Sequence, residues 1–205
     1  NGNDFLRQAS LKIEDPVVLS QVLSYMSELE LEKLDSDSKG DLFEHVLKQI
    51  RTAGELGQFR TPRHIIRAMI KIINPKIGET IYDPAAGTAG FLAAAYDHIR
   101  LINSSNSGIN TIEIDGQTIK RGVGDKLNDK EWEVLKNQTL FGNDVDPTMV
   151  RLAQMNLMLR GLDNIKILHR NVLTSQLENN QKISMGIPVK GFNVILANPP
   201  FSGKL

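Results

Sequence analysis

The 205-residue sequence has no cysteine and no apolar run near the roughly 20 residues that a membrane-spanning helix needs. Without cysteine there can be no disulfide bond and no thiolate metal site, and the four histidines are scattered without the spacing of metal ligands. The first residues, Asn1 to Asp4, lack the basic and apolar pattern of a secretory signal. We therefore expect a cytoplasmic protein with no metal and no membrane contact.

An excess of charge of either sign is also absent, because 24 lysines and arginines balance 24 aspartates and glutamates. Proteins that hold DNA by themselves usually carry a basic excess that neutralises phosphates. If DNA is the substrate, a partner should supply much of the contact with the DNA phosphates. The hydrophobic content of 40% is typical of a folded protein, and the length suits one full-sized core with a smaller helical segment.

The first part of the chain is predicted to be helical. Apolar residues recur every three or four positions between residues 15 and 34, a polar run at 35–40 is expected to end that helix, and a second apolar stripe runs from Leu42 to Ile50. Thr61 and Pro62 then resemble the N-cap and first residue of a third helix. We expect residues 1–56 to form a helical segment and residues 57–205 to form a separate domain.

After the third helix, short apolar strands alternate with helices, which favours an α/β fold with helices on both faces of a Rossmann-like parallel sheet of about four strands. The expected strands are 80–82, 139–142, 165–168 and 194–197, and the expected helices are 90–102 and 147–160. An insertion at about 104–136 contains alternating residues around Asp115-Gly116, which predicts a tight hairpin.

A turn rich in small residues follows the first strand and opens the next helix, with the sequence DPAAGTAGF at residues 83–91. Ligands of open parallel sheets bind beyond the carboxyl ends of the strands, and small residues allow a ligand to approach the backbone. The position therefore indicates a cofactor turn, although an ordinary strand-to-helix loop has the same composition. It is not a P-loop, because no Gly-Lys-Ser/Thr follows.

Two acidic residues follow the second strand. Asp144 is placed to accept hydrogen bonds from the two hydroxyls of a ribose, and the alternative is a solvated loop carboxylate. Asp146 precedes Pro147 and a helical stripe, so it is better interpreted as a helix N-cap.

The last strand runs directly into Asn198-Pro199-Pro200-Phe201. Two prolines stiffen the backbone and remove two donors, so this turn can present the Asn198 side-chain oxygen and the Pro199 carbonyl to one amino group. A rigid loop without chemistry is the alternative.

Taken together, four segments resemble the N6-adenine DNA methyltransferases, specifically the modification subunits of type I restriction-modification systems. They are residues 57–62, 83–92, 142–144 with 155–157, and 198–201, and they occur in the order and spacing of that family. The resemblance covers about residues 41–205.

This resemblance implies S-adenosylmethionine as the cofactor and a flipped adenine of DNA as the methyl acceptor. Asn198 and the Pro199 carbonyl would hold the amino group, Pro200 would stiffen the turn, and Phe201 would stack on the base. Asp144 would bind the cofactor ribose. The residues expected to bind the cofactor are Gln58, Phe59, Thr61, Pro62, Asp83, Ala85, Gly87, Thr88, Gly90, Phe91, Asp144 and Asn171.

The resemblance also implies partners: a specificity subunit that reads the DNA sequence, a restriction subunit, and hence a hetero-oligomer. Three departures accompany it. Ala89 stands where the family has glycine, Asn171 where it offers an aspartate to the cofactor's adenine, and the chain ends soon after Phe201, so we expect a fragment of a longer protein. The alternatives are a methyltransferase acting on RNA or on a protein glutamine, and a catalytically silent scaffold.

Overall fold

A parallel sheet of four strands lies at the centre of the protein. The computed structural model describes residues 11–52, 61–114, 116–174 and 176–199. The strands lie in the order β5-β4-β1-β6 and comprise β1 (Ile81–Asp83), β4 (Leu140–Asp144), β5 (Lys166–His169) and β6 (Val194–Ile195). All three pairings are parallel, so the predicted α/β sheet is confirmed.

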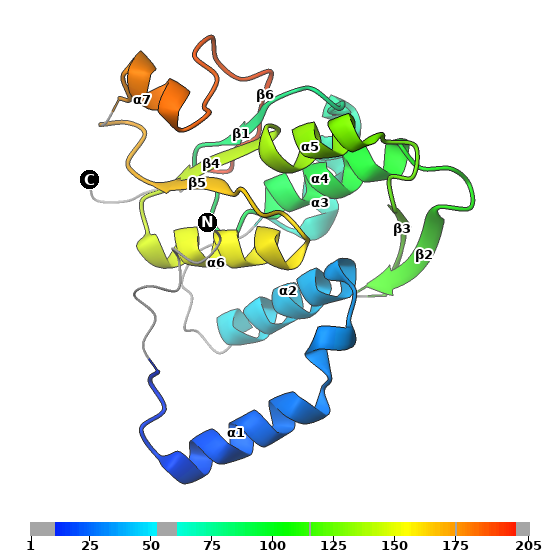
Figure 1. Ribbon diagram of the computed structural model, residues 1–205, viewed down its shortest axis with the longest axis vertical. Helices are drawn as coiled ribbons and strands as arrows, with labels where there is room; N and C mark the ends of the chain where they lie inside the picture. Colours follow the sequence, from blue (N-terminus) through cyan, green and yellow to red (C-terminus); the bar gives the residue numbers. More distant parts are fainter. Residues whose placement is uncertain (1–10, 53–60, 115, 175, 200–205) are drawn as a thin grey trace.

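One face of this sheet carries the main core. Helix α4 (Gly90–Ile102) and helix α6 (Pro147–Leu159) pack against it, as Figure 1 shows. Fully buried residues such as Ile81, Leu92 and Ile99 fill the interface. Asp146 caps α6 as predicted, since its carboxylate accepts from the Thr148 amide at 2.7 Å.

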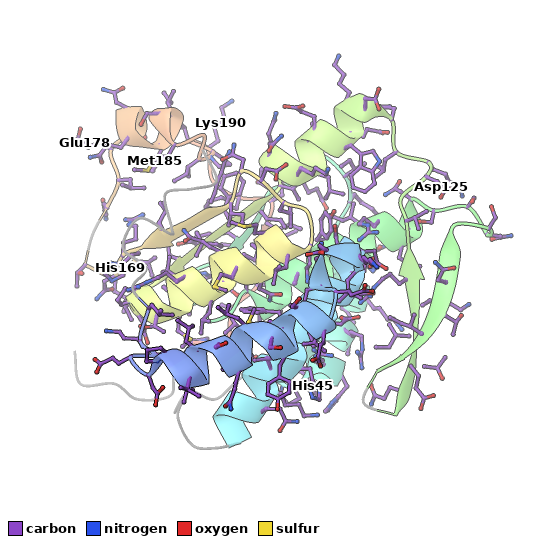
Figure 2. All side chains as sticks on the ribbon, turned by 60° about the horizontal axis from the view of Figure 1, so that its bottom comes forward. His45, Asp125, His169, Glu178, Met185 and Lys190 are labelled. Atoms are coloured by element: carbon purple, nitrogen blue, oxygen red, sulfur yellow. The ribbon has the colours of Figure 1, made fainter. Side chains whose placement is uncertain are left out.

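The other face is covered by the segment that leads from β5 through α7 (Asn179–Ser184) to β6, which contacts the sheet through Gly186 and Phe192. Successive strand residues point to opposite faces, so Tyr82 and Phe141 lie here rather than in the main core. Phe192 stacks on Tyr82 with ring centroids 4.4 Å apart and lies 5.2 Å from Phe141. Figure 2 shows the α7 segment far from His45 of the amino-terminal helices.

The insertion forms the predicted hairpin and one helix that the sequence pattern did not predict. Strands β2 (Ile109–Ile114) and β3 (Gln117–Gly122) pair antiparallel, and Ile114 lies opposite Gln117 across the turn. Helix α5 (Asp129–Asn137) follows. Its capping box, in which Asn128 and Glu131 bond each other's backbone, is readable in the sequence and could have revealed it.

The amino-terminal part is helical, but its boundaries differ from the prediction. It comprises α1 (Pro16–Glu28), the short 3₁₀ helix η2 (Leu31–Lys33) and α2 (Ser36–Thr52). The polar run at 35–40 was expected to be a break, yet most of it is the first turn of α2. Asp35 accepts a hydrogen bond from the Ser38 amide at 2.7 Å, so a polar sequence starts a helix here.

Buried ion pairs hold α2 against the sheet domain. Arg160, 4% exposed at the end of α6, donates to Glu44 at 2.8 Å and to Asp97 at 3.0 Å. Two bidentate pairs, Arg100 with Asp37 and Arg121 with Asp41, flank it. Gly40 lies so close to Arg160 that an added Cβ would be 2.9 Å from its Cγ. We name these side chains the Arg160 network: Asp37, Asp41, Glu44, Arg63, Asp97, Arg100, Arg121 and Arg160.

Helix α3 (Arg63–Ile73) connects this network to the sheet, since it packs on α4 and its first residue pairs with Glu44. No helix in the described ranges is both long and apolar enough to cross a membrane.

Candidate active site

Three of the predicted site residues lie at the carboxyl edge of the sheet, each at the end of a different strand. From β1 the chain proceeds to β4 and β5 on one side and then returns to β6 on the other. The order therefore reverses beside β1, and such a reversal creates a crevice beyond the carboxyl ends of the strands, where α/β proteins bind their ligands. Asp83 ends β1, Asp144 ends β4, and Asn198 follows β6.

The turn at residues 83–91, here called the Asp83 turn, is stabilised by the carboxylate of its first residue. Asp83 is only 1% exposed, and one of its carboxylate oxygens accepts from the Ala85 amide at 3.0 Å. Burial raises the pKa of Asp83 to about 7, with the Ala85 amide opposing the rise and the nearby Asp144 adding to it. The protein's own groups therefore stabilise the charged form of Asp83 poorly, and a buried acid with so perturbed a pKa is a candidate functional group.

Asp144 joins the Asp83 turn to the end of β4. One carboxylate oxygen accepts from the Gly87 amide at 2.8 Å, and the other accepts from the Asp146 amide at 2.9 Å. Gly142 allows the close approach of the turn, because a Cβ there would lie 3.2 Å from the Ala86 methyl. The carboxylate is thus fixed in orientation beside the turn, and each oxygen keeps a further lone pair.

The end of the Asp83 turn is supported by a residue whose role the sequence analysis missed. Asn156 of α6 is fully buried and donates to the Thr88 carbonyl at 2.8 Å. Ala89, next in the chain, adopts the left-handed conformation with φ 63°. This conformation costs an alanine roughly 1–2 kcal/mol and a glycine nothing. The signal for Asn156 was a polar residue on the apolar side of a predicted helix.

The remaining turn residues differ in exposure. Ala85, Gly87 and Gly90 are half-buried, whereas Thr88 is buried. Phe91 is buried and belongs to the main core. Among the described residues, neither the Thr88 hydroxyl nor the Asn143 side-chain nitrogen finds a hydrogen-bond partner, although both are buried.

Two predicted segments that are far apart in the sequence meet at Asn198. Its side-chain nitrogen donates to the Thr61 hydroxyl at 2.9 Å, and both residues are half-buried. Pro199 is exposed. The predicted helix-capping role of Thr61 is wrong, because Pro62 occupies the N-cap position of α3 and no side chain caps that end. The Thr61 hydroxyl instead contacts Asn198.

Asn171 follows β5 at the same edge of the sheet. Its side-chain oxygen accepts from the Leu173 amide at 2.9 Å, which forms a local turn. Gln58, Phe59, Pro200 and Phe201, also predicted as site residues, lie outside the described residues.

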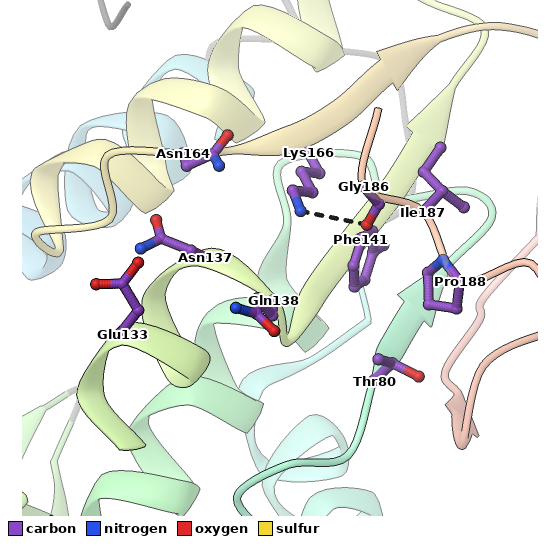
Figure 3. Close-up of a pocket in the computed structure, with 10 residues that line it drawn as sticks. All are labelled: Thr80, Glu133, Asn137, Gln138, Phe141, Asn164, Lys166, Gly186, Ile187 and Pro188. Carbon is purple, nitrogen blue, oxygen red and sulfur yellow. Dashed lines mark hydrogen bonds between the residues drawn. The ribbon is translucent and has the colours of Figure 1, made fainter. Parts of the chain in front are cut away.

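A hollow of about 590 Å³ lies elsewhere, as Figure 3 shows. Thr80 precedes β1, Gln138 precedes β4 and Lys166 begins β5, so this hollow is at the amino ends of the strands. Lys166 lies over the Phe141 ring and donates to the Gly186 carbonyl at 3.3 Å. Because ligands of open parallel sheets bind at the carboxyl ends, the Asp83 turn, and not this hollow, is the candidate active site.

Comparison with known proteins agrees with this geometry. The chain is 29% identical over 194 residues to the EcoEI methylase subunit, a type I restriction enzyme subunit of Escherichia coli, and this match covers 93% of the chain and 33% of that subunit. It is 30% identical over 203 residues to the StySJI methylase subunit of Salmonella typhimurium, covering 94% of the chain and 33% of the subunit. The chain thus spans about a third of the length of these relatives.

A solved structure, that of a modification subunit assigned to a type I restriction enzyme of Vibrio vulnificus YJ016, superposes with a TM-score of 0.57. The two sequences are 28% identical, and the match covers 80% of this chain and 28% of that one. The sheet and its carboxyl-edge turns therefore define a Rossmann-like methyltransferase fold, as the sequence predicted. The family pattern of the N-6 DNA methylases matches residues 34–205, and the chain belongs to this family.

Proposed function

We propose that the protein transfers a methyl group from S-adenosylmethionine to the N6 amino group of adenine in DNA, as the modification subunit of a type I restriction-modification complex. Membership in the N-6 DNA methylase family and similarity to type I methylase subunits support the reaction class. The observation that carries the proposal is the placement of Asn198, hydrogen-bonded to Thr61, beside the crevice at the carboxyl edge of the sheet.

The residues at the Asp83 turn suit S-adenosylmethionine. This cofactor carries positive charge on its sulfonium and ammonium groups, and the raised pKa of Asp83 marks a position where a nearby cation is favourable. Asp144 has an oriented carboxylate, and ribose hydroxyls are donors that such a group accepts. We therefore assign the Asp83 turn to the methionine part and Asp144 to the ribose. When bound, the cofactor supplies an electrophilic methyl group.

The chain's own contribution to the reaction is orientation of the acceptor base. Adenine N6 is a weak nucleophile, because its lone pair is delocalised into the ring. Hydrogen bonds from the amino group to Asn198 Oδ1 and to the Pro199 carbonyl favour a geometry in which this lone pair points out of the ring plane, toward the methyl donor. Phe201 would stack on the flipped base. No covalent intermediate with the protein is required.

The partners we propose are DNA, a specificity subunit and a restriction subunit. The relatives are named as subunits, and the formal net charge of this sequence is zero. A neutral chain gains little affinity from phosphate neutralisation, so a specificity subunit would supply DNA contacts and sequence reading. We also propose that residues 1–56 and 57–205 are separate units, joined by the Arg160 network.

The test is transfer of tritiated methyl to DNA by the full-length gene product with its co-expressed specificity subunit. Asn198→Ala should lower kcat by about 100-fold or more, because it removes an acceptor used at the reacting group. Asn164→Ala, at the opposite edge of the sheet, is the matched control and should leave the rate unchanged. Methyl found in RNA or protein but never in DNA, or an Asn198→Ala variant as fast as the control, would exclude this function.

A further inference from the structure

The Thr61 hydroxyl has a role at Asn198 that its position before a helix does not suggest. Threonine before a helix usually caps it, but α3 begins after Pro62, whose carbonyl accepts from the amides of Ile65 and Ile66. The Thr61 hydroxyl is 2.9 Å from the Asn198 side-chain nitrogen and accepts its hydrogen. A segment 137 residues earlier in the sequence thus fixes the amide of the candidate catalytic residue.

The direction of this hydrogen bond decides what Asn198 offers to a substrate. A side-chain amide has a donor end and an acceptor end, and rotation by half a turn exchanges them. With the nitrogen directed at Thr61, the oxygen is directed away from it. The opposite orientation would present an NH₂ group to the amino group of the base, and two donors repel each other.

We propose that Thr61 is a positioning residue that holds the Asn198 amide with its oxygen toward the target amino group. The inference rests on the proposed function and extends it. Thr61 acts through Asn198, so its loss should lower the rate of methyl transfer at saturating cofactor.

Thr61 is itself held by the Arg160 network. Arg63, two residues later, pairs with Glu44 at 2.6 Å, and Glu44 also accepts from Arg160 at 2.8 Å. Glu44 is 6% exposed and Arg160 is 4% exposed, so the Glu44–Arg160 pair is well shielded from water. The Arg63 side chain is 30% exposed, and its pairing with the buried Glu44 anchors the backbone two residues from Thr61, as the support of a precisely held catalytic group requires.

Thr61→Val is the informative variant, because valine keeps the shape of threonine and removes the hydroxyl. In the DNA methylation assay with the full-length gene product, we expect kcat to fall about tenfold, the value of one neutral hydrogen bond that sets the amide orientation. The rate is measured at saturating S-adenosylmethionine, with the dissociation constant for the cofactor determined by calorimetry for each variant. Thr61→Ser, which restores the hydroxyl, should recover most of the loss. Thr118→Val on the exposed hairpin is the matched control.

A double variant separates this role from others. Because Thr61 acts through Asn198, Thr61→Val combined with Asn198→Ala should be no slower than Asn198→Ala alone. A double variant about tenfold slower than Asn198→Ala would overturn the inference, since Thr61 would then act independently. Weaker cofactor binding with an unchanged saturated rate in Thr61→Val would also overturn it and would assign Thr61 to the cofactor.

The proposed function and this inference fail in different ways. If Asn198→Ala methylates DNA normally, the proposed function is wrong. If Asn198→Ala is inactive while Thr61→Val is as fast as the control, only the role of Thr61 is wrong. Thermal unfolding of each variant, compared with Thr61→Ser, shows whether a lost rate reflects lost folding.

Discussion

Replacing Arg160 by methionine tests whether the Arg160 network holds α2 to the sheet domain. Methionine keeps much of the length and the apolar stem that packs against Gly40 but removes the guanidinium. Glu44 and Asp97 then lose donors at 2.8 and 3.0 Å. Removing one partner of a buried ion pair costs roughly 3–5 kcal/mol, and we expect about 3 kcal/mol here, since Glu44 still pairs with Arg63.

The measurement is urea unfolding followed by circular dichroism, with the free energy of unfolding compared between variants at equal protein concentration. Arg151→Met is the matched control, because Arg151 is an exposed arginine on the same helix. A surface change of this kind should alter stability by less than about 0.5 kcal/mol. If Arg160→Met unfolds with the same free energy as Arg151→Met, the network contributes nothing and the reasoning is wrong.

The pH dependence of the stability loss in Arg160→Met distinguishes a charge effect from a loss of packing. Burial raises the pKa of Asp97, and Arg160 opposes that rise, so the variant should have an even higher Asp97 pKa. A carboxyl with a raised folded-state pKa contributes stability that is present at low pH and is lost as pH rises through that pKa. The penalty of Arg160→Met should therefore be smaller at pH 5 than at pH 8. A penalty that grows on acidification would contradict this.

Two further predictions concern the Asp83 turn. Asp83→Asn keeps an acceptor for the Ala85 amide but cannot ionise. The pKa of Asp83 is raised from 3.8 to about 7, so the free energy of unfolding of the wild type should fall by about 4 kcal/mol between acidic pH and pH 8 as this carboxyl ionises. The variant should thus be more stable than wild type at pH 8 and equal to it near pH 4, and equal stabilities at both pH values would refute the assignment. Gly142→Ala should destabilise the protein by roughly 1–3 kcal/mol, since its Cβ would meet the Ile167 Cδ1 at 2.8 Å and the Ala86 Cβ at 3.2 Å. Chemical unfolding measures this loss of stability, and a variant as stable as the wild type would show that the Asp83 turn can move away from β4.

Local sequence patterns predicted most of the sheet domain. The four strands and the helices α4 and α6 lie within a few residues of their predicted bounds, because apolar periodicity, Asp-Pro caps and small-residue turns are encoded in neighbouring residues. The same logic failed at residues 35–40, where composition indicated a break. Asp35 caps the helix that begins there, and ion pairs with distant arginines hold its first turns.

Contacts between distant segments could not be predicted in this way. In the Arg160 network, the hydrogen bonds of Arg100, Arg121 and Arg160 join side chains that are separated by 63 to 116 positions, and sequence patterns showed only a balanced total charge. The Thr61 hydroxyl is another case, since its local signal indicated a helix cap and its actual partner follows β6. The strand order also had to come from the structure, because it decides which carboxyl ends share a crevice.

The hydrogen bond between Thr61 and Asn198 has a consequence for the order of events during protein synthesis. It closes a loop of 137 residues that contains β1, β4, β5 and both core helices. Closing such a loop is entropically unfavourable until the enclosed elements have folded and shortened the path between its ends. The nascent chain should therefore pack its main core before Asn198 reaches Thr61. A ribosome-bound chain that ends before β6 would be folded in large part and still lack the hydrogen bond between Thr61 and Asn198.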